Sequence, residues 1–222
     1  MVNTSSYISI LEFAKAHEVC LIAVSKTKPI ETIKELYDLG QRDFGENKVQ
    51  ELVEKHEALP KDIRWHMIGH LQSNKVKYIA PFVHFIHAVD SFKLMKEINK
   101  RAGKENRKIN VLLQLHIAQE ESKFGMNKEE LTDIINDDVF REMENIQLSG
   151  LMGMASFIDD EKQVKQEFDL LKNVFEELKS KDIAGDDFKE ISMGMSGDYK
   201  IAIESGSTMI RIGSLLFGVR SY

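Results

Sequence analysis

A lysine at the end of a buried apolar run is the residue in this sequence best placed for covalent chemistry. The apolar run at 20–24 leads into Lys26, and Pro29 then suits the first turn of a helix. We therefore expect a strand over 20–26 with Lys26 at its last inward position. Burial disfavours the charged form of an amine, and a neutral amine can attack a carbonyl carbon to form a Schiff base. The alternative is an ordinary strand-end lysine whose amine reaches solvent.

Two glycine-containing turns near the C-terminus have the residue types of an anion-binding site. The first turn presents Met195 and Ser196 after a strand, so its backbone N–H groups and the serine hydroxyl can bind an anion at the start of a short helix. The second offers Gly213, where the backbone can approach a ligand closely, followed by Ser214. The alternative is that these glycines serve only tight turns.

A Schiff-base lysine combined with a phosphate site predicts an aldehyde that carries a phosphate group. Pyridoxal 5′-phosphate fits this description, and a phosphorylated sugar aldehyde or ketone also fits. Arg211 bears on the choice, because a cation beside a pyridine nitrogen opposes protonation of that nitrogen and so limits carbanion chemistry. The alternative for Arg211 is a salt bridge inside the core.

The order of the predicted elements indicates how these residues are brought together. Strands are expected at 20–26, 42–47, 63–69, 83–89, 110–117, 146–154, 188–193 and 209–213, the last running into 215–218. Helices are expected at 4–18, capped by Ser5 or Ser6, and at 29–39, 48–58, 74–80, 91–102, 127–143, 160–180 and 197–204. Eight such units favour a closed (β/α)8 TIM barrel with an extra N-terminal helix over an open doubly wound sheet. Barrels bind ligands at the C-terminal ends of their strands.

Composition and charge exclude several other classes of protein. The net charge of −6 provides no basic surface, so neither nucleic acid nor an anionic membrane is an expected partner. The single cysteine, Cys20, allows no internal disulfide, and the seven histidines show no ligand spacing, so no metal is expected. The N-terminus has no secretory pattern and no run is long enough to span a membrane. We expect one domain over 1–222 in the cytoplasm.

Motifs along almost the whole chain carry a family resemblance. They are the segments 23–27, 44–47 with 50–51, 65–75, 121–125, 150–154, 192–198, and 211–214 with 217–218. In these segments the chain resembles the pyridoxal phosphate homeostasis protein family.

The resemblance implies a fold-type III barrel similar to the N-terminal domain of alanine racemase. It implies that Lys26 carries pyridoxal 5′-phosphate as an internal aldimine. Ser196, Gly213 and Ser214 would hold the phosphate, with Arg211 facing the pyridine nitrogen. The candidate cofactor-binding set, in which Asn47 and His66 would line the pocket, is Lys26, Asn47, His66, Met195, Ser196, Arg211, Gly213 and Ser214.

The same resemblance implies a role in balancing vitamin B6 and amino-acid pools, with the cofactor passed to pyridoxal-phosphate-dependent apo-enzymes. Alanine racemase adds a β domain and a tyrosine base from its partner subunit. Only five residues follow Phe217, and no tyrosine here lies in an equivalent motif, so no robust catalysis is expected. The alternatives are a racemase-like enzyme of low activity and a Schiff-base aldolase acting on a phosphorylated sugar. A monomer is expected.

Overall fold

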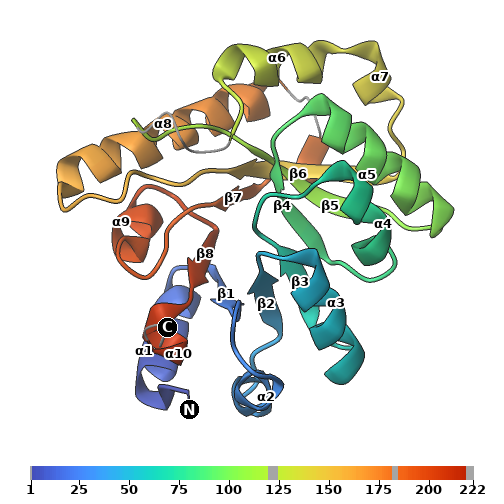
Figure 1. Cartoon of the computed structure of the whole chain (residues 1–222). Coiled ribbons are helices and arrows are strands. Elements are labelled where there is room, and N and C mark those ends of the chain that lie inside the picture. The colour runs from blue at the N-terminus through green and yellow to red at the C-terminus, as the bar shows by residue number, and fades with distance from the viewer. Residues whose placement is uncertain (1, 120–124, 182–184, 219–222) are drawn as a thin grey trace.

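The chain folds into a closed parallel barrel surrounded by helices, as a computed structural model of residues 2–119, 125–181 and 185–218 shows (Figure 1). The eight strands pair in sequence order, and β8 pairs with β1 to close the ring. The strands are β1 (Cys20–Val24), β2 (Asp43–Glu46), β3 (Arg64–Met67), β4 (Phe85–Val89), β5 (Ile109–Gln114), β6 (Ile146–Met152), β7 (Glu190–Ser192) and β8 (Met209–Ile212). This confirms the predicted (β/α)8 barrel.

Helices cover the outside of the barrel and follow the strands in alternation. They are α1 (Thr4–Ala16), α2 (Ile30–Asp38), α3 (Val49–Ala58), α4 (Val76–Ile79), α5 (Phe92–Lys104), α6 (Lys128–Asn136), α7 (Asp138–Arg141), α8 (Glu161–Ser180), α9 (Tyr199–Glu204) and α10 (Ser214–Phe217), with 3-10 turns at Ser73–Lys75 and Gly185–Asp187. The expected extra N-terminal helix is α1. It lies beside α10 in Figure 1, and the Asn3 N–H donates to the Leu216 carbonyl at 2.8 Å.

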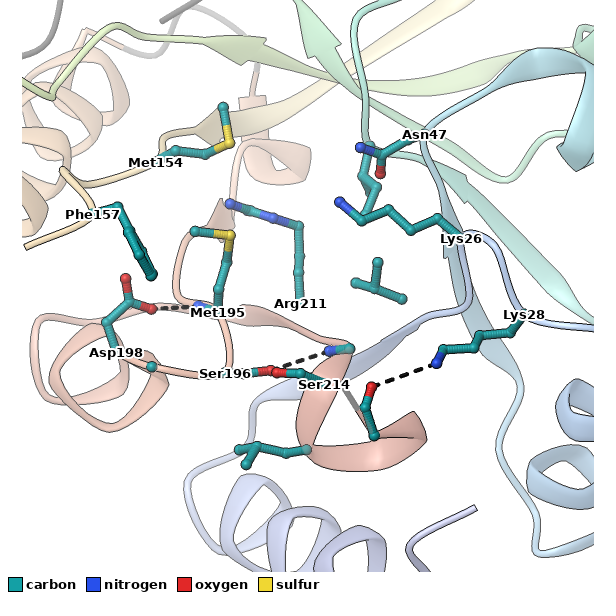
Figure 2. A pocket seen from close by; sticks show the side chains of 16 residues that line it. Lys26, Lys28, Asn47, Met154, Phe157, Met195, Ser196, Asp198, Arg211 and Ser214 are labelled. Carbon is teal, nitrogen blue, oxygen red and sulfur yellow. Dashed lines mark hydrogen bonds between the residues drawn. The ribbon is translucent and has the colours of Figure 1, made fainter. Parts of the chain in front are cut away.

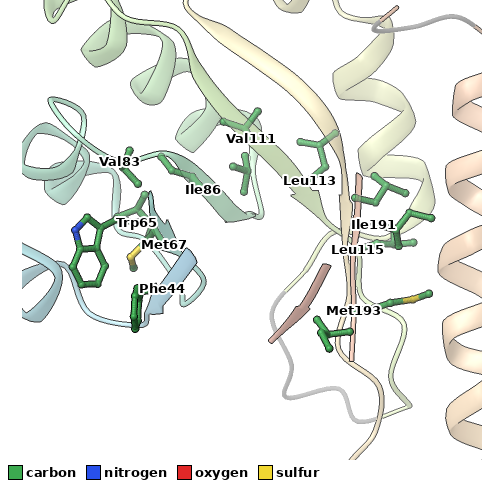
Figure 3. Packing of buried hydrophobic residues seen from close by; sticks show 14 of the residues in the cluster. Phe44, Trp65, Met67, Val83, Ile86, Val111, Leu113, Leu115, Ile191 and Met193 are labelled. Atoms are coloured by element: carbon green, nitrogen blue, oxygen red, sulfur yellow. The ribbon is translucent and has the colours of Figure 1, made fainter. Parts of the chain in front are cut away.

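The main hydrophobic core lies between the outer face of the barrel and the helices. Alternate side chains of each strand point outward, and Figure 3 shows Trp65, Ile86, Val111 and Leu113 in this layer. All four are fully buried. The core therefore packs the helices onto the strands, and the loops at the strand ends are free to carry other side chains.

A smaller apolar cluster is separate from this core. It consists of Ile22, Phe85, Leu112, Met152 and Met209, which alternate along their strands with outward-facing core residues. These side chains fill part of the barrel interior. Other interior positions carry buried polar side chains, among them His66, His87, Ser192 and Arg211.

The first strand is shorter than expected. β1 ends at Val24, so Lys26 lies in the following turn and is not the last inward residue of the strand. The turn is closed by the Lys28 N–H, which donates to the Ser25 carbonyl at 3.0 Å. Thr27 has a φ of 65°, a left-handed conformation that a strand cannot contain.

Three other expectations about the helices are corrected. The helix expected at 127–143 is divided at Asp137, whose extended backbone ends α6 and whose carboxylate accepts from the Val139 N–H to cap α7. The segment expected to extend the eighth strand is the helix α10. The N-cap of α1 is Asn3, because its side chain accepts from the Ser6 N–H. The motif segment 121–124 lies outside the described residues.

Candidate functional site

A cavity of about 630 Å³ opens at the C-terminal ends of the strands. Every residue of the candidate set except His66 lines it: Lys26, Asn47, Met195, Ser196, Arg211, Gly213 and Ser214. They come from the loops after β1, β2, β7 and β8 and from β8 itself, so residues distant in sequence meet at one end of the barrel. Figure 2 shows Lys26, from the turn after β1, and Arg211, from β8, reaching into the cavity.

A buried ionic cluster holds the turn that carries Lys26. The Lys55 amine lies 2.8 Å from the Ser25 carbonyl oxygen, 2.7 Å from Glu46 Oε1 and 2.6 Å from Glu51 Oε1. The Ser25 hydroxyl donates to Glu46, and the Thr27 N–H donates to Glu51, each at 2.5 Å. The residues on both sides of Lys26 are therefore fixed. This restricts where its amine can reach.

Glu46 directly precedes the cavity residue Asn47, but its carboxylate binds Ser25 and Lys55 in the buried ionic cluster. Burial raises the pKa of the Glu46 carboxyl, and the Lys55 amine offsets only part of that effect. Its side chain is completely buried and is not among the residues that line the cavity. This arrangement disfavours the aldolase alternative, in which Glu46 would exchange protons beside Lys26.

The loops after β7 and β8 bring hydroxyl and backbone groups together on one side of the cavity. The Gly213 N–H donates to Ser196 Oγ at 3.3 Å, which places the two loops in contact (Figure 2). Asp198 accepts from the Met195 N–H at 2.5 Å and fixes the first loop. Hydroxyl and N–H donors grouped in this way match the acceptor oxygens of a phosphate.

The backbone of the β7–α9 loop requires glycine at position 194. Gly194 has a φ of 94°, and a Cβ atom there would lie 2.6 Å from the Cβ of Ala202. The close approach lets α9 pack directly against the loop that precedes Ser196.

Arg211 forms the inner wall of the cavity. Its guanidinium donates to Ser192 Oγ at 2.6 Å and to the Gly153 carbonyl at 3.0 Å, both neutral oxygens. Burial lowers the pKa of Arg211 to about 10, and the field of Asp198 opposes the shift. The guanidinium stays charged at neutral pH. The salt bridge considered for Arg211 is not among the ion pairs of the described chain.

His66 does not line the cavity, which corrects that expectation. Its side chain points into the barrel interior, where Nδ1 contacts His87 Nε2 at 2.9 Å and Nε2 contacts Asp43 Oδ1 at 3.1 Å. Because β3 ends at Met67, the strand delivers Ile68 to the cavity instead. His66 and Ile68 are two positions apart and share the inward face, so they differ in their depth along the barrel.

The residues of the cavity fit pyridoxal 5′-phosphate. Asn47 Oδ1 is buried without a hydrogen-bond partner in the protein, which is the condition of an atom that a ligand could satisfy. The set also supplies an amine, hydroxyl donors and a buried cation, matching an aldehyde, a phosphate and an aromatic nitrogen base.

Sequence relatives agree with this chemistry. The family model described as the alanine racemase N-terminal domain matches residues 9–221. The pyridoxal phosphate homeostasis protein of Aquifex aeolicus is 41% identical over 204 residues, covering 91% of this chain and 87% of the relative. The human protein of the same name is 41% identical over 213 residues, covering 91% and 77%. The chain belongs to the pyridoxal phosphate homeostasis protein family.

Solved structures place this family member among similar barrels. PipY of Synechococcus elongatus, solved with pyridoxal phosphate bound, is 34% identical with a TM-score of 0.82, covering 90% of this chain and 93% of PipY. Alanine racemase of Streptomyces coelicolor has a TM-score of 0.73 at 14% identity and is covered over 55% of its length, which shows a shared fold alone.

Several residues of the site were not predicted. Lys28 also lines the cavity, and its amine donates to the Phe217 carbonyl at 3.0 Å. Phe157, almost fully exposed, lies at the cavity rim. Lys55 and Ser192 lie behind the cavity; Ser192 belongs to the motif segment 192–198, whereas Lys55 lies in none of the motif segments. Within the described ranges, no cluster of side chains is suited to a metal, and no helix has the length and apolar character to cross a membrane.

Proposed function

We propose that this chain binds pyridoxal 5′-phosphate covalently through the Lys26 amine and takes part in homeostasis of that cofactor. The convergence of Lys26, the Ser196 and Ser214 hydroxyls and Arg211 on one cavity carries the proposal. Bound there, pyridoxal 5′-phosphate supplies an aldehyde carbon and an electron-withdrawing ring. Lys26 Nζ would form a C=N bond with that carbon, with release of one water.

Gly213 and the two serines would bind the phosphate, and Arg211 would lie beside the ring. A fixed cation beside the ring nitrogen opposes its protonation, so the ring would be a weak electron sink. The bound aldehyde would therefore be stored more readily than it would be used for carbanion chemistry.

The other ionisable side chains of the cavity favour holding over turnover. Lys28 donates to a carbonyl near the C-terminal end of α10, and Asp198 accepts from the Met195 N–H. Both therefore already have structural roles. No tyrosine of the described chain lines the cavity. We propose a non-catalytic carrier whose recipients are pyridoxal-phosphate-dependent apo-enzymes. The monomeric state and cytoplasmic location stay predictions.

The test is a visible absorption titration of the purified protein with pyridoxal 5′-phosphate, followed by borohydride reduction and peptide mapping. We expect a band that saturates at one equivalent and a label on Lys26. Lys26→Ala should lose both. Lys28→Ala, which removes the other lysine of the same cavity, should keep the label on Lys26. A label on Lys28, or one spread over surface lysines, would overturn the proposal.

The same samples separate a carrier from a weak racemase-like enzyme. Incubation of the loaded protein with L-alanine, followed by chiral analysis, should show no D-alanine above the level produced by free pyridoxal 5′-phosphate. Production that requires Lys26 would favour the enzyme.

A further inference from the structure

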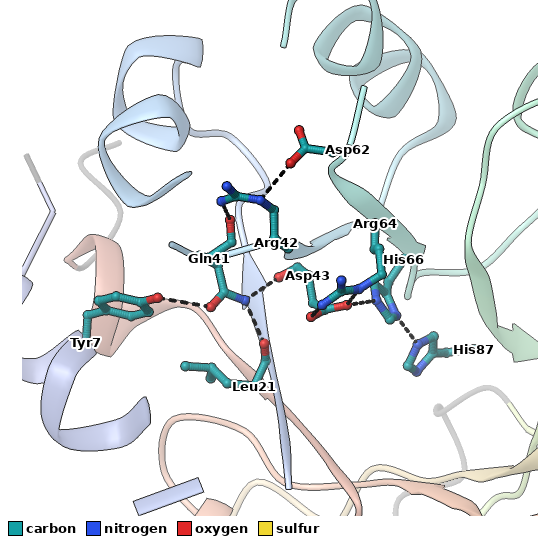
Figure 4. A network of polar contacts seen from close by, with 9 residues as sticks. All are labelled: Tyr7, Leu21, Gln41, Arg42, Asp43, Asp62, Arg64, His66 and His87. Carbon is teal, nitrogen blue, oxygen red and sulfur yellow. Dashed lines mark hydrogen bonds and ion pairs between the residues drawn. The ribbon is translucent and has the colours of Figure 1, made fainter. Parts of the chain in front are cut away.

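A chain of buried polar side chains runs from Arg211 through the interior of the barrel. Arg211 Nη1 donates to Ser192 Oγ at 2.6 Å, and His87 Nδ1 lies 2.9 Å from the same oxygen. His87 Nε2 lies 2.9 Å from His66 Nδ1, and His66 Nε2 lies 3.1 Å from Asp43 Oδ1. Figure 4 shows the part of this chain from His87 to Asp43.

This series of hydrogen-bonded side chains connects the two ends of the barrel. Arg211 lines the cavity at the C-terminal ends of the strands. Asp43 and His66 border a second cavity of about 440 Å³, lined by residues at the N-terminal ends of the strands. The links between them are almost completely removed from solvent, since Ser192 and His87 have 0% and His66 has 1% of their surface exposed. A buried polar group without a hydrogen bond destabilises the folded protein, so each side chain in the series restricts the orientation of the next.

Arg211 and Asp43, at the two ends of the series, indicate the direction in which its hydrogen bonds are donated. An arginine can only donate hydrogen bonds, and an ionised carboxylate can only accept them. Burial by itself would raise the pKa of the Asp43 carboxyl, but hydrogen bonds from His66 and Arg64 outweigh it and lower that pKa far below its ordinary range. Asp43 is therefore the accepting end.

The intermediate tautomers follow from that direction. Burial holds the pKa of His87 well below its ordinary value, so this imidazole carries one N–H. We assign the remaining hydrogens so that the hydrogen bonds run in this one direction: Ser192 donates to His87 Nδ1, and the His87 Nε2–H donates to His66 Nδ1. The His66 Nε2–H donates to Asp43. Every link is satisfied, and Ser192 Oγ is left with lone pairs directed at Arg211.

We propose that Asp43, His66 and His87 are positioning residues, which act through Ser192 to hold the Arg211 guanidinium in the orientation that faces the cofactor. The part that concerns the cofactor rests on the proposed function, whereas the ordering of Arg211 does not. None of the three touches the cavity of Lys26. The proposal gives His66 a role that its position outside that cavity would otherwise leave without explanation.

The first test uses the protein without cofactor and measures solvent exchange of the Arg211 guanidinium N–H groups by nitrogen-15 NMR. His66→Phe keeps a flat buried ring but removes the hydrogen bonds in the middle of the series, so exchange of the Arg211 N–H groups should become about tenfold faster. His84→Phe is the matched control. His84 lies 5.6 Å from the His66 ring but outside the chain, and its replacement should leave exchange unchanged.

The second test measures the dissociation constant and absorption maximum of bound pyridoxal 5′-phosphate. His66→Phe and Ser192→Ala should each weaken binding about tenfold and shift the band equally. The double variant should be no worse than either single one, because both remove the same support. His66→Gln, which can donate and accept, should recover part of the affinity.

These outcomes separate the inference from the proposed function. If the wild type does not bind the cofactor, the proposed function fails and Arg211 exchange still decides the positioning. If the wild type binds but the two losses multiply in the double variant, or His84→Phe weakens binding as much as His66→Phe, the inference is overturned. Should His66→Phe not fold, Asp43→Asn, which removes the charged acceptor at the far end of the hydrogen bonds, provides both readouts.

Discussion

Lys55 and Glu46 form an ion pair of 2.7 Å whose side chains are only 5% and 0% exposed. The same amine contacts the carbonyl of Ser25, the residue before Lys26. A pair buried to this degree contributes mainly by fixing geometry, because desolvation offsets most of the attraction. The turn that carries Lys26 is thereby anchored to α3.

Removal of the Lys55 cation should destabilise the protein strongly. Lys55→Met leaves two carboxylates without their cation, and we expect a loss of about 3–5 kcal/mol in the free energy of unfolding, measured by urea denaturation. Lys34→Met is the control, since the Lys34–Asp38 pair is more than half exposed and its loss should change little. Equal effects of the two substitutions would contradict the structural role given to Lys55.

Gly194→Ala should damage both the fold and cofactor binding. A left-handed backbone costs a non-glycine residue about 1–2 kcal/mol, and the new Cβ would also collide with Ala202. We expect a larger loss of stability than for Gly40→Ala, where φ is 102° but nothing lies within 4 Å. In a cofactor titration Gly194→Ala should bind more weakly, because Met195 and Ser196 are displaced. Gly40→Ala should bind normally, and a normal titration of both would refute the displacement.

Asn47→Ala should separate stability from binding. The side chain has a buried oxygen without a protein partner, and such an atom carries a desolvation penalty of about 1–3 kcal/mol. Thermal unfolding without cofactor should therefore show no loss, or a gain, while the affinity for pyridoxal 5′-phosphate falls. Asn110→Ala should show the reverse pattern, because Asn110 donates to the His84 carbonyl far from the cavity. A loss of apo-protein stability without a change in affinity would argue against a ligand-binding role for Asn47.

Acid should destabilise the protein through His84. Burial lowers the pKa of His84 to about 4, whereas the unfolded chain has a histidine pKa of about 6.5. The unfolded state therefore binds the proton first, and stability present above about pH 6.5 is lost as the pH falls toward 4. Urea denaturation at several pH values should show a shallower decline for His84→Gln over this window. An identical decline would show that His84 does not titrate in this way. Asp43, with its lowered pKa, stabilises the folded protein above about pH 4, and this stabilisation is lost only as the pH falls below that value.

The sequence by itself determined the barrel and most of the candidate residues that line the cavity at the C-terminal ends of its strands. Apolar runs separated by amphipathic helical segments predict alternating strands and helices, and eight such units favour a closed barrel over an open sheet. Lys26, Ser196 and Gly213 could be identified because their signals are local: a lysine after an apolar run, and serine or glycine in a turn after a strand. Such signals depend on neighbouring residues alone.

Only the tertiary structure decided which inward side chains meet. Lys26 lies in a turn because Lys55 and Glu51 hold its neighbours, and these contacts cross from α3 to the β1–α2 loop. His66 faces Asp43 and His87 instead of the cavity, because the register between strands sets the depth of each side chain in the barrel. Contacts across the interior join residues from 19 to 105 positions apart, and no local pattern specifies them.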